Sequence, residues 1–590
     1  MPITKHNEKF LPTSKKEMQA LGWEQADVIL FSGDAYVDHP SFGAAVIGRV
    51  LENAGYKVAI VPQPNWRDDL RDFKKLGIPR LFFAVTSGNM DSMINHYTAN
   101  KRLRSDDAYT AGGESGYRPD YAVKTYSQII KNINPDIPLV IGGVEASLRR
   151  FTHYDYWSDK LLPNILVDSQ ADMLVYGMGE RAIVEIAKKI DAGIDIKLIR
   201  STPQTAYLTD FSSFDADSKE VIKLHSYEEC LKHSQKFGEN FKNIEEESNK
   251  LTAKVLVEPI GDNYLVVNPP FPPATTQEMD DWWDLPYVRQ PHPRYKGKVI
   301  PAWEMIKFSV NIHRGCFGGC SFCTISAHQG KFISSRSEKS IINEVENITH
   351  NLDFKGYLTD LGGPSANMYR MQGKDLKICE KCKKPSCIYP TICNNLDHNH
   401  KPLLELYRKV REVKGIKKAF IGSGIRYDMF TDWSNSTNRE YFDELVRFHV
   451  SGRLKVAPEH TEDEVLKYMR KPSFKLFEDI KVKFDLINRK HGINQQLIPY
   501  FISSHPGCTL SHMNKLATLM ERMRLQLEQV QDFTPTPMTL SSTIFYTGVD
   551  PYTGKSVYVA RSKEDKLKQR ELFFWSKKPT KTNTPKGKGR

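Results

Sequence analysis

Three cysteines stand close together in the stretch RGCFGGCSFC, at Cys316, Cys320 and Cys323. Cysteine thiolates hold zinc ions and iron–sulfur clusters, and protein sites of both kinds usually supply four ligands. A set of three predicts either a fourth ligand from another part of the chain or a metal position left open for another molecule. A cubane of four irons held by three thiolates has one such open iron.

A structural zinc site is the alternative for these cysteines, with His313 or His328 as a fourth ligand. The usual zinc pair is Cys-x2-Cys, which differs from the spacing of four and then three residues found here. Gly315, Gly318 and Gly319 remove side chains where the backbone must wrap closely round a bulky group, and they permit positive φ angles. The stretch therefore favours an iron–sulfur cluster over a single ion.

Four further cysteines, Cys379, Cys382, Cys387 and Cys393, form a second group. Four thiols within fifteen residues can close a complete site, either for zinc or for an auxiliary iron–sulfur cluster. Complete ligation suits structural support or electron relay, and an open position suits substrate binding. We expect a bound metal, and the alternative is a loop of reduced thiols.

Length and composition indicate a folded protein of several domains, with 590 residues of which 40% are hydrophobic. Seven of the nine cysteines lie between 316 and 393, a clustering typical of metal sites rather than disulfides in a cytosolic chain. Neither a membrane span nor a signal peptide is recognisable, so we expect a cytoplasmic protein. Residues 561–590 hold eleven Lys or Arg against three acidic residues, and this predicts a basic, disordered tail over 551–590 that could contact RNA.

The first 200 residues must position any ligand of the N-terminal part. Short apolar runs such as DVILFSG and PLVIGGVE alternate with helical stretches, which predicts a doubly wound α/β domain over 1–200. Ligands of such sheets bind at the carboxyl ends of strands, where 32–34, 142–143 and 177–180 fall. Residues 201–300 are polar and Pro-rich, and we expect a connector whose Trp282 and Trp283 serve packing.

A second α/β series follows over 301–550 and places the three cysteines directly after its first strand. Strands are expected near KFSVNI, KGYLTDLG, KKAFIGSG, RLKVAPE, QLIPYFISS and TLSSTIFYTG. Six alternations are too few for a full (β/α)8 barrel, so we expect a partial (β/α)6 barrel with its chemistry at the carboxyl ends of the strands. The second cysteine group forms an insertion over 376–398.

The motif Cys-x3-Cys-x2-Cys, with Phe322 before its last cysteine, resembles the signature of the radical S-adenosylmethionine (radical SAM) superfamily. The resemblance implies one 4Fe-4S cluster on Cys316, Cys320 and Cys323, whose free iron chelates S-adenosylmethionine. An electron from a donor such as flavodoxin or ferredoxin then cleaves this cofactor to methionine and a 5′-deoxyadenosyl radical, which abstracts hydrogen from a substrate.

The same resemblance extends to the strands that follow. Gly362 and Gly363 stand where the superfamily often has Gly-Gly-Glu, a segment that meets the methionine amino group, but Pro364 replaces the acid. Ser423-Gly424 with Arg426, and Glu459-His460, follow the third and fourth strands, where related enzymes contact the ribose or carboxylate. For Ser423-Gly424 a plain strand-to-helix turn is the alternative.

A narrower resemblance covers nearly the whole chain. The strings VIGGVEASLRRFTHYDYW, NIHRGCFGGCSFC, GGPSANMYR, SCIYPTICNNLDH, KVAPEHTED and LIPYFISSHPGC together look like the YgiQ-type family of radical SAM proteins. That family has no settled substrate, so the resemblance implies a chemistry and leaves the substrate open.

The N-terminal residues bear on two further ligands, cobalamin and nucleic acid. Asp38 and His39 are adjacent, whereas the cobalamin motif is Asp-x-His-x2-Gly, so we expect no cobalamin there and interpret His39 as a loop residue that binds backbone. The pair Arg149-Arg150 with Tyr154 and Tyr156 could form a stacking surface for nucleic acid, but an ordinary packed surface is favoured. The competing hypotheses to a radical enzyme are a nucleic-acid-binding protein with structural metal sites and a radical SAM enzyme that modifies RNA.

Overall fold

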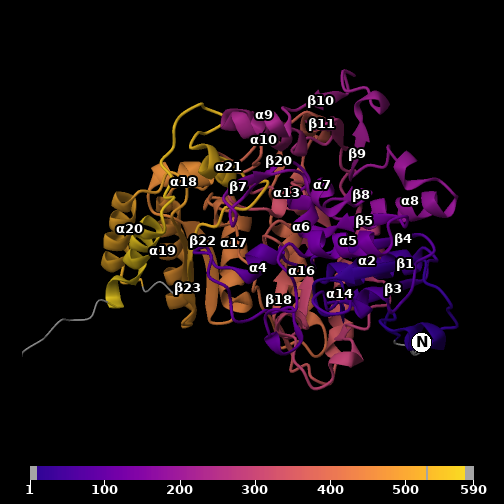
Figure 1. Ribbon diagram of the computed structural model, residues 1–590. Coiled ribbons are helices and arrows are strands. Elements are labelled where there is room, and N and C mark those ends of the chain that lie inside the picture. Colours follow the sequence, from indigo (N-terminus) through magenta and orange to yellow (C-terminus); the bar gives the residue numbers. More distant parts are fainter. Residues whose placement is uncertain (1–8, 526–528, 578–590) are drawn as a thin grey trace, which may run out of the picture.

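The computed structural model describes residues 9–525 and 529–577. The chain forms two halves, one built on a nine-stranded sheet and the other on smaller sheets of two or three strands (Figure 1). The N-terminal half lies at the right of Figure 1, in indigo and purple, and the C-terminal half lies at the left, in orange and yellow. Separate hydrophobic cores support the two halves. The expected pairing of a doubly wound unit with a partial barrel is confirmed.

The N-terminal sheet has nine strands, and those from β8 to β3 run parallel. In spatial order they are β10 (Val221–Lys223), β11 (Val255–Ile260), β12 (Asn263–Val267), β9 (Thr205–Asp210), β8 (Met173–Val175), β5 (Leu139–Gly142), β4 (Phe82–Thr86), β1 (Val28–Ser32) and β3 (Val58–Pro62). Buried parallel strands need apolar side chains on both faces, as the continuous Val, Ile and Phe runs indicate.

Helices cover both faces of the parallel strands. Alternate side chains of β1 point to opposite faces, so Ile29 packs with α5 (Ala122–Ile133), whereas Leu30 packs with α2 (Gly43–Asn53) and α8 (Glu180–Asp191). This arrangement is the doubly wound architecture predicted from the sequence.

The segment 201–300 differs from the expected connector. Its strands β9, β11 and β12 continue the N-terminal sheet through antiparallel pairs that begin at β8, so the sheet extends past residue 200. The expected helical piece forms α9 (Tyr227–Lys232) and α10 (Ser234–Ser248). Its polar composition concealed the strands because only β12 has a continuous apolar run.

The C-terminal half has six successive strand positions with helices between them, as expected for a partial barrel. The strands are β14 (Ser309–Asn311), β17 (Tyr357–Leu358) with β18 (Asp360–Gly362), β21 (Lys418–Ala419), β22 (Arg453–Glu459), β23 (Gln496–Ser503) and β24 (Gln529–Asp532). The pairs β14–β18, β17–β21, β22–β23 and β23–β24 are all parallel.

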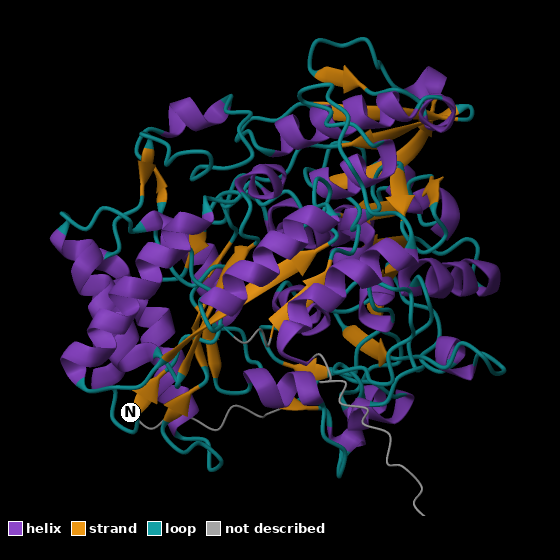
Figure 2. Ribbon diagram, turned by 90° about the vertical axis from the view of Figure 1, so that its left-hand side faces the viewer, coloured by secondary structure: helices purple, strands orange, loops and turns teal. Residues whose placement is uncertain are grey.

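The outer layer of this half is helical (Figure 2). It consists of α14 (Glu338–Thr349), α16 (Lys401–Glu412), α17 (Ser436–Glu444), α18 (Asp463–Met469), α19 (Phe474–His491) and α20 (Leu510–Arg522). Their buried residues share one core with the strands. The carboxyl ends of the strands are therefore free to carry the site loops.

The sixth strand was placed wrongly from the sequence. TLSSTIFYTG contains helix α21 (Leu540–Thr547), and the sixth strand is β24 instead. The hydroxyl of Thr539 accepts a hydrogen bond from the Ser542 amide at the start of the helix, and Gly548 ends it in the left-handed conformation. These end signals and the packing of the helix outweigh the strand propensity of its β-branched and aromatic residues.

The remaining expectations concern the insertion and the tail. Strands β19 (Gln372–Gly373) and β20 (Leu396–Asp397) pair antiparallel and close the base of the cysteine-rich insertion. The tail was predicted to be disordered from 551, but α22 (Lys563–Glu571) continues the fold and buries Gln569. Residues 578–590 of that prediction lie outside the described residues. Within the described part of the chain, no helix combines the length and apolar character needed to cross a membrane.

Candidate functional site

The loop with the three cysteines follows β14 and the short strand β15 (His313–Arg314), at the carboxyl end of the barrel's first strand. Gly315 and Gly319 both have positive φ, of 87° and 62°. A Cβ atom on Gly315 would lie 2.2 Å from the Phe332 carbonyl oxygen, and one on Gly319 would lie 2.4 Å from the Pro385 carbonyl oxygen. Only glycine satisfies both demands, so these residues allow the loop to pack tightly against its neighbours.

The C-terminal region holds the same loop from another side. The Ser321 amide donates to the Met469 carbonyl (3.2 Å), and the Ser541 amide donates to the Ser321 carbonyl (2.9 Å). The Ser541 hydroxyl donates to the Ser321 hydroxyl (2.8 Å) and contacts Nε2 of His505 (2.7 Å). Sequence analysis missed Ser541, because its segment was assigned to a strand.

A buried arginine lies against the thiols. Nη1 of Arg426 is 3.1 Å from Sγ of Cys320, and the same guanidinium forms an ion pair with Asp428 (2.6 Å). Burial raises the pKa of Cys323 to about 12 and also raises the pKa of Cys316, which the positive charge of Arg426 opposes. Arg426 therefore supplies positive charge beside these three half-buried cysteines, as a cluster held by thiolates needs. Asp428 was not recognised in the sequence.

Gly362 and Gly363 end the second strand position beside this loop. A Cβ atom on Gly362 would meet the Ser423 hydroxyl at 2.3 Å, and one on Gly363 would meet the His313 ring at 2.6 Å. The Ser423 hydroxyl donates to Asp360 (2.9 Å), so the third strand position is linked to the second. The two glycines thus allow close packing here, and their contact with S-adenosylmethionine remains a prediction.

The candidates after the fourth strand have different surroundings. Glu459 is buried with a positive φ of 68°, at a register shift between β22 and β23, and its carboxylate is 3.8 Å from Nζ of Lys471. Strained backbone of this kind is often found at functional sites. His460 instead accepts a hydrogen bond from the Glu462 amide and lies 3.5 Å from Sγ of Cys508, so its contacts are internal to the fold.

A single metal ion is the alternative to a cluster in the cysteine loop. Among residues 9–525 and 529–577, no three His, Cys, Asp or Glu side chains are placed to hold one metal ion. His313 packs beneath Gly363, and Nδ1 of His328 contacts the Ser147 hydroxyl in the N-terminal half (3.1 Å). Three thiols on a glycine-rich loop beside a guanidinium fit an iron–sulfur cluster, which is larger than one ion.

The second cysteine group packs directly against the first loop. The Cys387 amide donates to the Phe317 carbonyl (3.0 Å), and Phe317 shares a hydrophobic cluster with Cys387 and Cys393. Nζ of Lys331 is 3.8 Å from Sγ of Cys382, although this ammonium group is only 2% exposed. Burial raises the pKa of Cys387 to about 11, and Lys331 opposes that rise. The group thus has a buried cation that favours thiolates.

Two adjoining cavities lie between the halves. One, of about 390 Å³, is lined by Gly142 and Gly143, by residues 177–180 and by Arg314 of the cysteine loop. Two of the three strand ends where a ligand is expected thus line a cavity, and ligand binding there stays a prediction. The third, 32–34, is filled by protein contacts, because Asp34 forms an ion pair with the buried Arg118 (2.8 Å).

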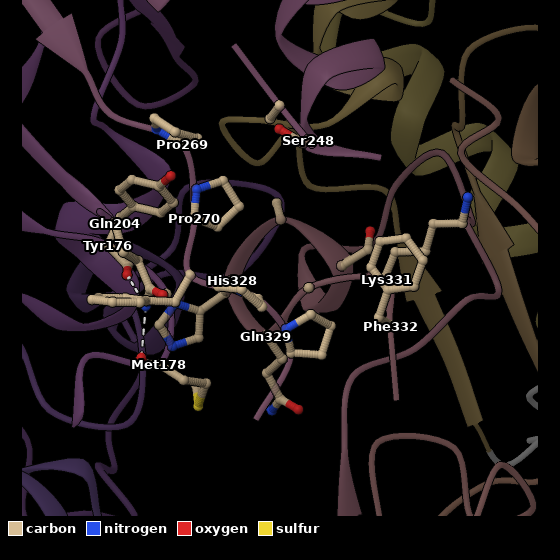
Figure 3. Close-up of a pocket in the computed structure, with 18 of the residues that line it drawn as sticks. Tyr176, Met178, Gln204, Ser248, Pro269, Pro270, His328, Gln329, Lys331 and Phe332 are labelled. Carbon is tan, nitrogen blue, oxygen red and sulfur yellow. Dashed lines mark hydrogen bonds between the residues drawn. The ribbon is translucent and has the colours of Figure 1, made fainter. Parts of the chain in front are cut away.

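The other cavity, of about 160 Å³, shares Gly177, His328 and Gln329 with the first (Figure 3). Figure 3 shows His328 between Tyr176 and Gln204 on one side and Lys331 and Phe332 on the other. Trp282 lines this cavity and Trp283 lines the larger one, so the packing predicted for these tryptophans takes place at the cavity walls.

The weaker N-terminal candidates are buried. Nδ1 of His39 accepts a hydrogen bond from the Ser41 amide (3.1 Å), which confirms a loop residue that binds backbone. The absence of cobalamin stays a prediction. Arg149 and Arg150, with Tyr154 and Tyr156, are all at most 4% exposed, so they form no stacking surface for nucleic acid.

Two family models and several curated relatives match the chain. The family Radical SAM N-terminal matches residues 10–309, and the family Domain of unknown function (DUF3362) matches residues 528–580. A UPF0313 protein of Bacteroides thetaiotaomicron is 58% identical over 590 residues, covering 97% of this chain and 95% of the relative. A UPF0313 protein of Methanosarcina acetivorans is 45% identical, covering 96% and 78%.

Two solved structures share limited similarity with the chain. The radical S-adenosylmethionine methyltransferase TsrM from Kitasatospora setae, with cobalamin and a [4Fe-4S] cluster bound, has a TM-score of 0.49 at 15% identity and covers 93% of this chain and 91% of its own. The cobalamin-dependent S-adenosylmethionine radical enzyme OxsB has a TM-score of 0.48 at 10% identity, with 95% and 57% covered. On the sequence matches, the chain belongs to the UPF0313 family of radical SAM proteins.

Proposed function

We propose that the chain is a radical SAM enzyme whose 4Fe-4S cluster is held by Cys316, Cys320 and Cys323, with hydrogen abstraction from the substrate as its reaction. Family membership supports S-adenosylmethionine-dependent radical chemistry. The observation that carries the assignment of ligands is the contact between the buried Arg426 guanidinium and Sγ of Cys320 (3.1 Å) in the glycine-rich loop. A cluster bound there supplies the electron that cleaves the sulfur–carbon bond of S-adenosylmethionine.

The chain's own residues have separable tasks in this proposal. Arg426 stabilises negative charge on the thiolates and is oriented by Asp428. Gly362 and Gly363 are the proposed backbone contact of the methionine amino group. Glu459 is the candidate for a polar contact with S-adenosylmethionine, because it is buried near the thiols and its backbone is strained.

The second cysteine group is proposed to hold a metal as well. Lys331 supports this, because its buried ammonium opposes the rise that burial causes in the pKa of Cys379 and Cys387 and so favours their deprotonated, metal-binding form. The direct contact between Cys387 and Phe317 makes electron relay to the first loop a natural role. An anaerobically reconstituted double variant, Cys382→Ala with Cys387→Ala, should lose the iron or zinc of this site and keep the first cluster.

The substrate is proposed to bind between the two halves. Both cavities open there, and both are lined by residues of the segment that follows the three cysteines. The strand ends of the nine-stranded sheet form one wall of the larger cavity, and a radical intermediate requires such a covered site.

The test is product formation by anaerobically reconstituted protein. Wild type with dithionite and S-adenosylmethionine should release 5′-deoxyadenosine, and Cys320→Ala should release none. Cys230→Ala is the matched control, because Cys230 is a buried thiol in a different hydrophobic cluster. Colourless wild-type protein that contains only zinc would contradict the proposal, and so would full activity of Cys320→Ala.

A further inference from the structure

Arg150 is a buried arginine without a carboxylate partner. Its side chain lines the smaller cavity and is 4% exposed. Nη1 donates to the Ser147 carbonyl (2.7 Å), the guanidinium lies 4.6 Å from the centre of the Tyr176 ring, and Nε has no hydrogen-bond partner. Within the described residues no Asp or Glu forms an ion pair with it. A buried charge without a counter-ion is costly, so its retention beside a cavity points to an anion supplied from outside.

Other cations line the same cavity. Arg181, Lys250 and Arg314 are paired with Glu278, Glu247 and Glu180 respectively. The remaining two are Lys254, which forms no ion pair with any described residue, and Lys331, whose ammonium group lies against the second cysteine group. Glu247 is the acidic residue of the lining, and Lys250 already neutralises it. The positive charges therefore exceed the negative ones before any ligand binds, and this favours an anion.

His328 adds a hydrogen-bond acceptor to the cavity. The Ser147 hydroxyl donates to the Gly143 carbonyl (2.7 Å) and accepts from the Gly177 amide (2.9 Å). Its one hydrogen is thus used, so the contact with Nδ1 of His328 (3.1 Å) requires that Nδ1 donates. Burial and the charges of Arg150 and Arg314 lower the pKa of His328 to about 4, which keeps the ring neutral. Nε2 is then left with a free lone pair.

One wall of the cavity is apolar. Phe271 and Trp282 stand with the prolines of residues 269–273, and Tyr176 lies under Arg150. The volume of about 160 Å³ is close to the roughly 150 Å³ that holds one benzene ring. The cavity adjoins the cysteine loop, since the Cys316 amide donates to the carbonyl of its lining residue Gly330 (3.1 Å).

We propose that this cavity binds a small organic anion, with a carboxylate or phosphate on Arg150, a ring-sized apolar part against Trp282 and the prolines, and a donor group on Nε2 of His328. That the anion is the substrate of the radical reaction rests on the proposed function. The binding site itself does not, because it needs only the geometry of the cavity.

The experiment measures binding to the anaerobically reconstituted holoenzyme by calorimetry. The probes are benzoate, phenyl phosphate and the uncharged benzyl alcohol. At least one anion should bind at a single site about tenfold or more tightly than the alcohol. Whichever of benzoate and phenyl phosphate binds more tightly shows whether the site prefers a carboxylate or a phosphate. Arg150→Gln should weaken the binding of that anion about tenfold or more and leave the affinity for the alcohol unchanged.

Arg67→Gln is the matched control, because Arg67 also lies over an aromatic ring, that of Trp66 (4.2 Å), and donates to a backbone carbonyl, but it lines neither cavity. The anion affinity of this variant should stay within about twofold of wild type. The comparison of probes on wild type needs no variant, so it holds even if Arg150→Gln fails to fold. Equal affinity for anions and alcohol, absent anion binding, or an unchanged Arg150→Gln would overturn the inference. Release of 5′-deoxyadenosine by the same preparation is scored separately, so a failure of the proposed function is seen independently.

Discussion

Replacing Arg426 with glutamine is expected to lower the reduction potential of a cluster bound in the first cysteine loop. The guanidinium is buried and lies 3.1 Å from Sγ of Cys320, so its positive charge stabilises the more negative, reduced state. Glutamine keeps a hydrogen-bond donor and removes the charge. The same argument gives the opposite sign for Asp428→Asn, because that carboxylate is held on the guanidinium (2.6 Å).

The magnitude follows from the short contact. At an effective dielectric constant of about 20, a unit charge about 5 to 8 Å from the added electron contributes about 2 to 3 kcal/mol, or about 100 mV for a one-electron couple. The reduction potential of the cluster in Arg426→Gln should therefore lie about this far below that of wild type. The potential in Asp428→Asn should rise, but by less, since the carboxylate lies farther from the thiols than the guanidinium does. The potential in the double variant should be close to that of wild type.

The assay is a redox titration followed by electron paramagnetic resonance, with iron content determined for every variant. Shifts of the two single variants in the same direction would refute the electrostatic argument, as would potentials that all equal that of wild type. If Arg426→Gln retains no cluster, Asp428→Asn still tests the sign.

Three further predictions concern stability and metal content. Gly319→Ala should destabilise the protein by at least about 1 kcal/mol, because the residue has positive φ and its Cβ would lie 2.4 Å from a carbonyl oxygen, whereas Gly424→Ala, with no atom within 4 Å, should be close to neutral in thermal unfolding. Burial raises the pKa of Glu258 to about 7, so the folded state keeps a proton that the unfolded state has lost, and stability falls as pH rises from about 4.5 to 7. Glu258→Gln should remove that loss and stabilise the protein at pH 8 by up to about 3 kcal/mol in urea unfolding, and an equal gain at pH 4.5 would contradict this account. Iron and zinc analysis of Cys382→Ala with Cys387→Ala should show less metal than wild type, and equal content would leave the second group without a metal role.

The sequence allowed the two architectures and the cysteine loop to be predicted, because both depend on local patterns. Buried parallel strands need continuous apolar runs, and the glycines beside Cys316 and Cys320 indicate close packing of the backbone. The strands of 205–267 were missed because polar residues interrupt them and only pairing with β8 reveals them. Helix α21 was missed because its end signals outweigh its strand-like composition.

The site was predictable to a smaller extent. Arg426 was recognised by its position after the third strand, but its partner Asp428 could be identified only from the fold. The smaller cavity was not foreseen, because Arg150, His328 and Trp282 come from distant segments that meet only when the halves pack together. No pattern in one segment indicates that Arg150 lacks a carboxylate.

The hydrogen bonds between Ser321 and Ser541 have a consequence for the order of events during synthesis. The two residues are 220 positions apart, so the ribosome must deliver most of the chain before the cysteine loop acquires these contacts. A nascent chain that already exposes all three cysteines still lacks these hydrogen bonds. We therefore expect stable loading of the cluster to follow synthesis of the segment that contains Ser541, and a chain ending before residue 540 to bind iron only transiently.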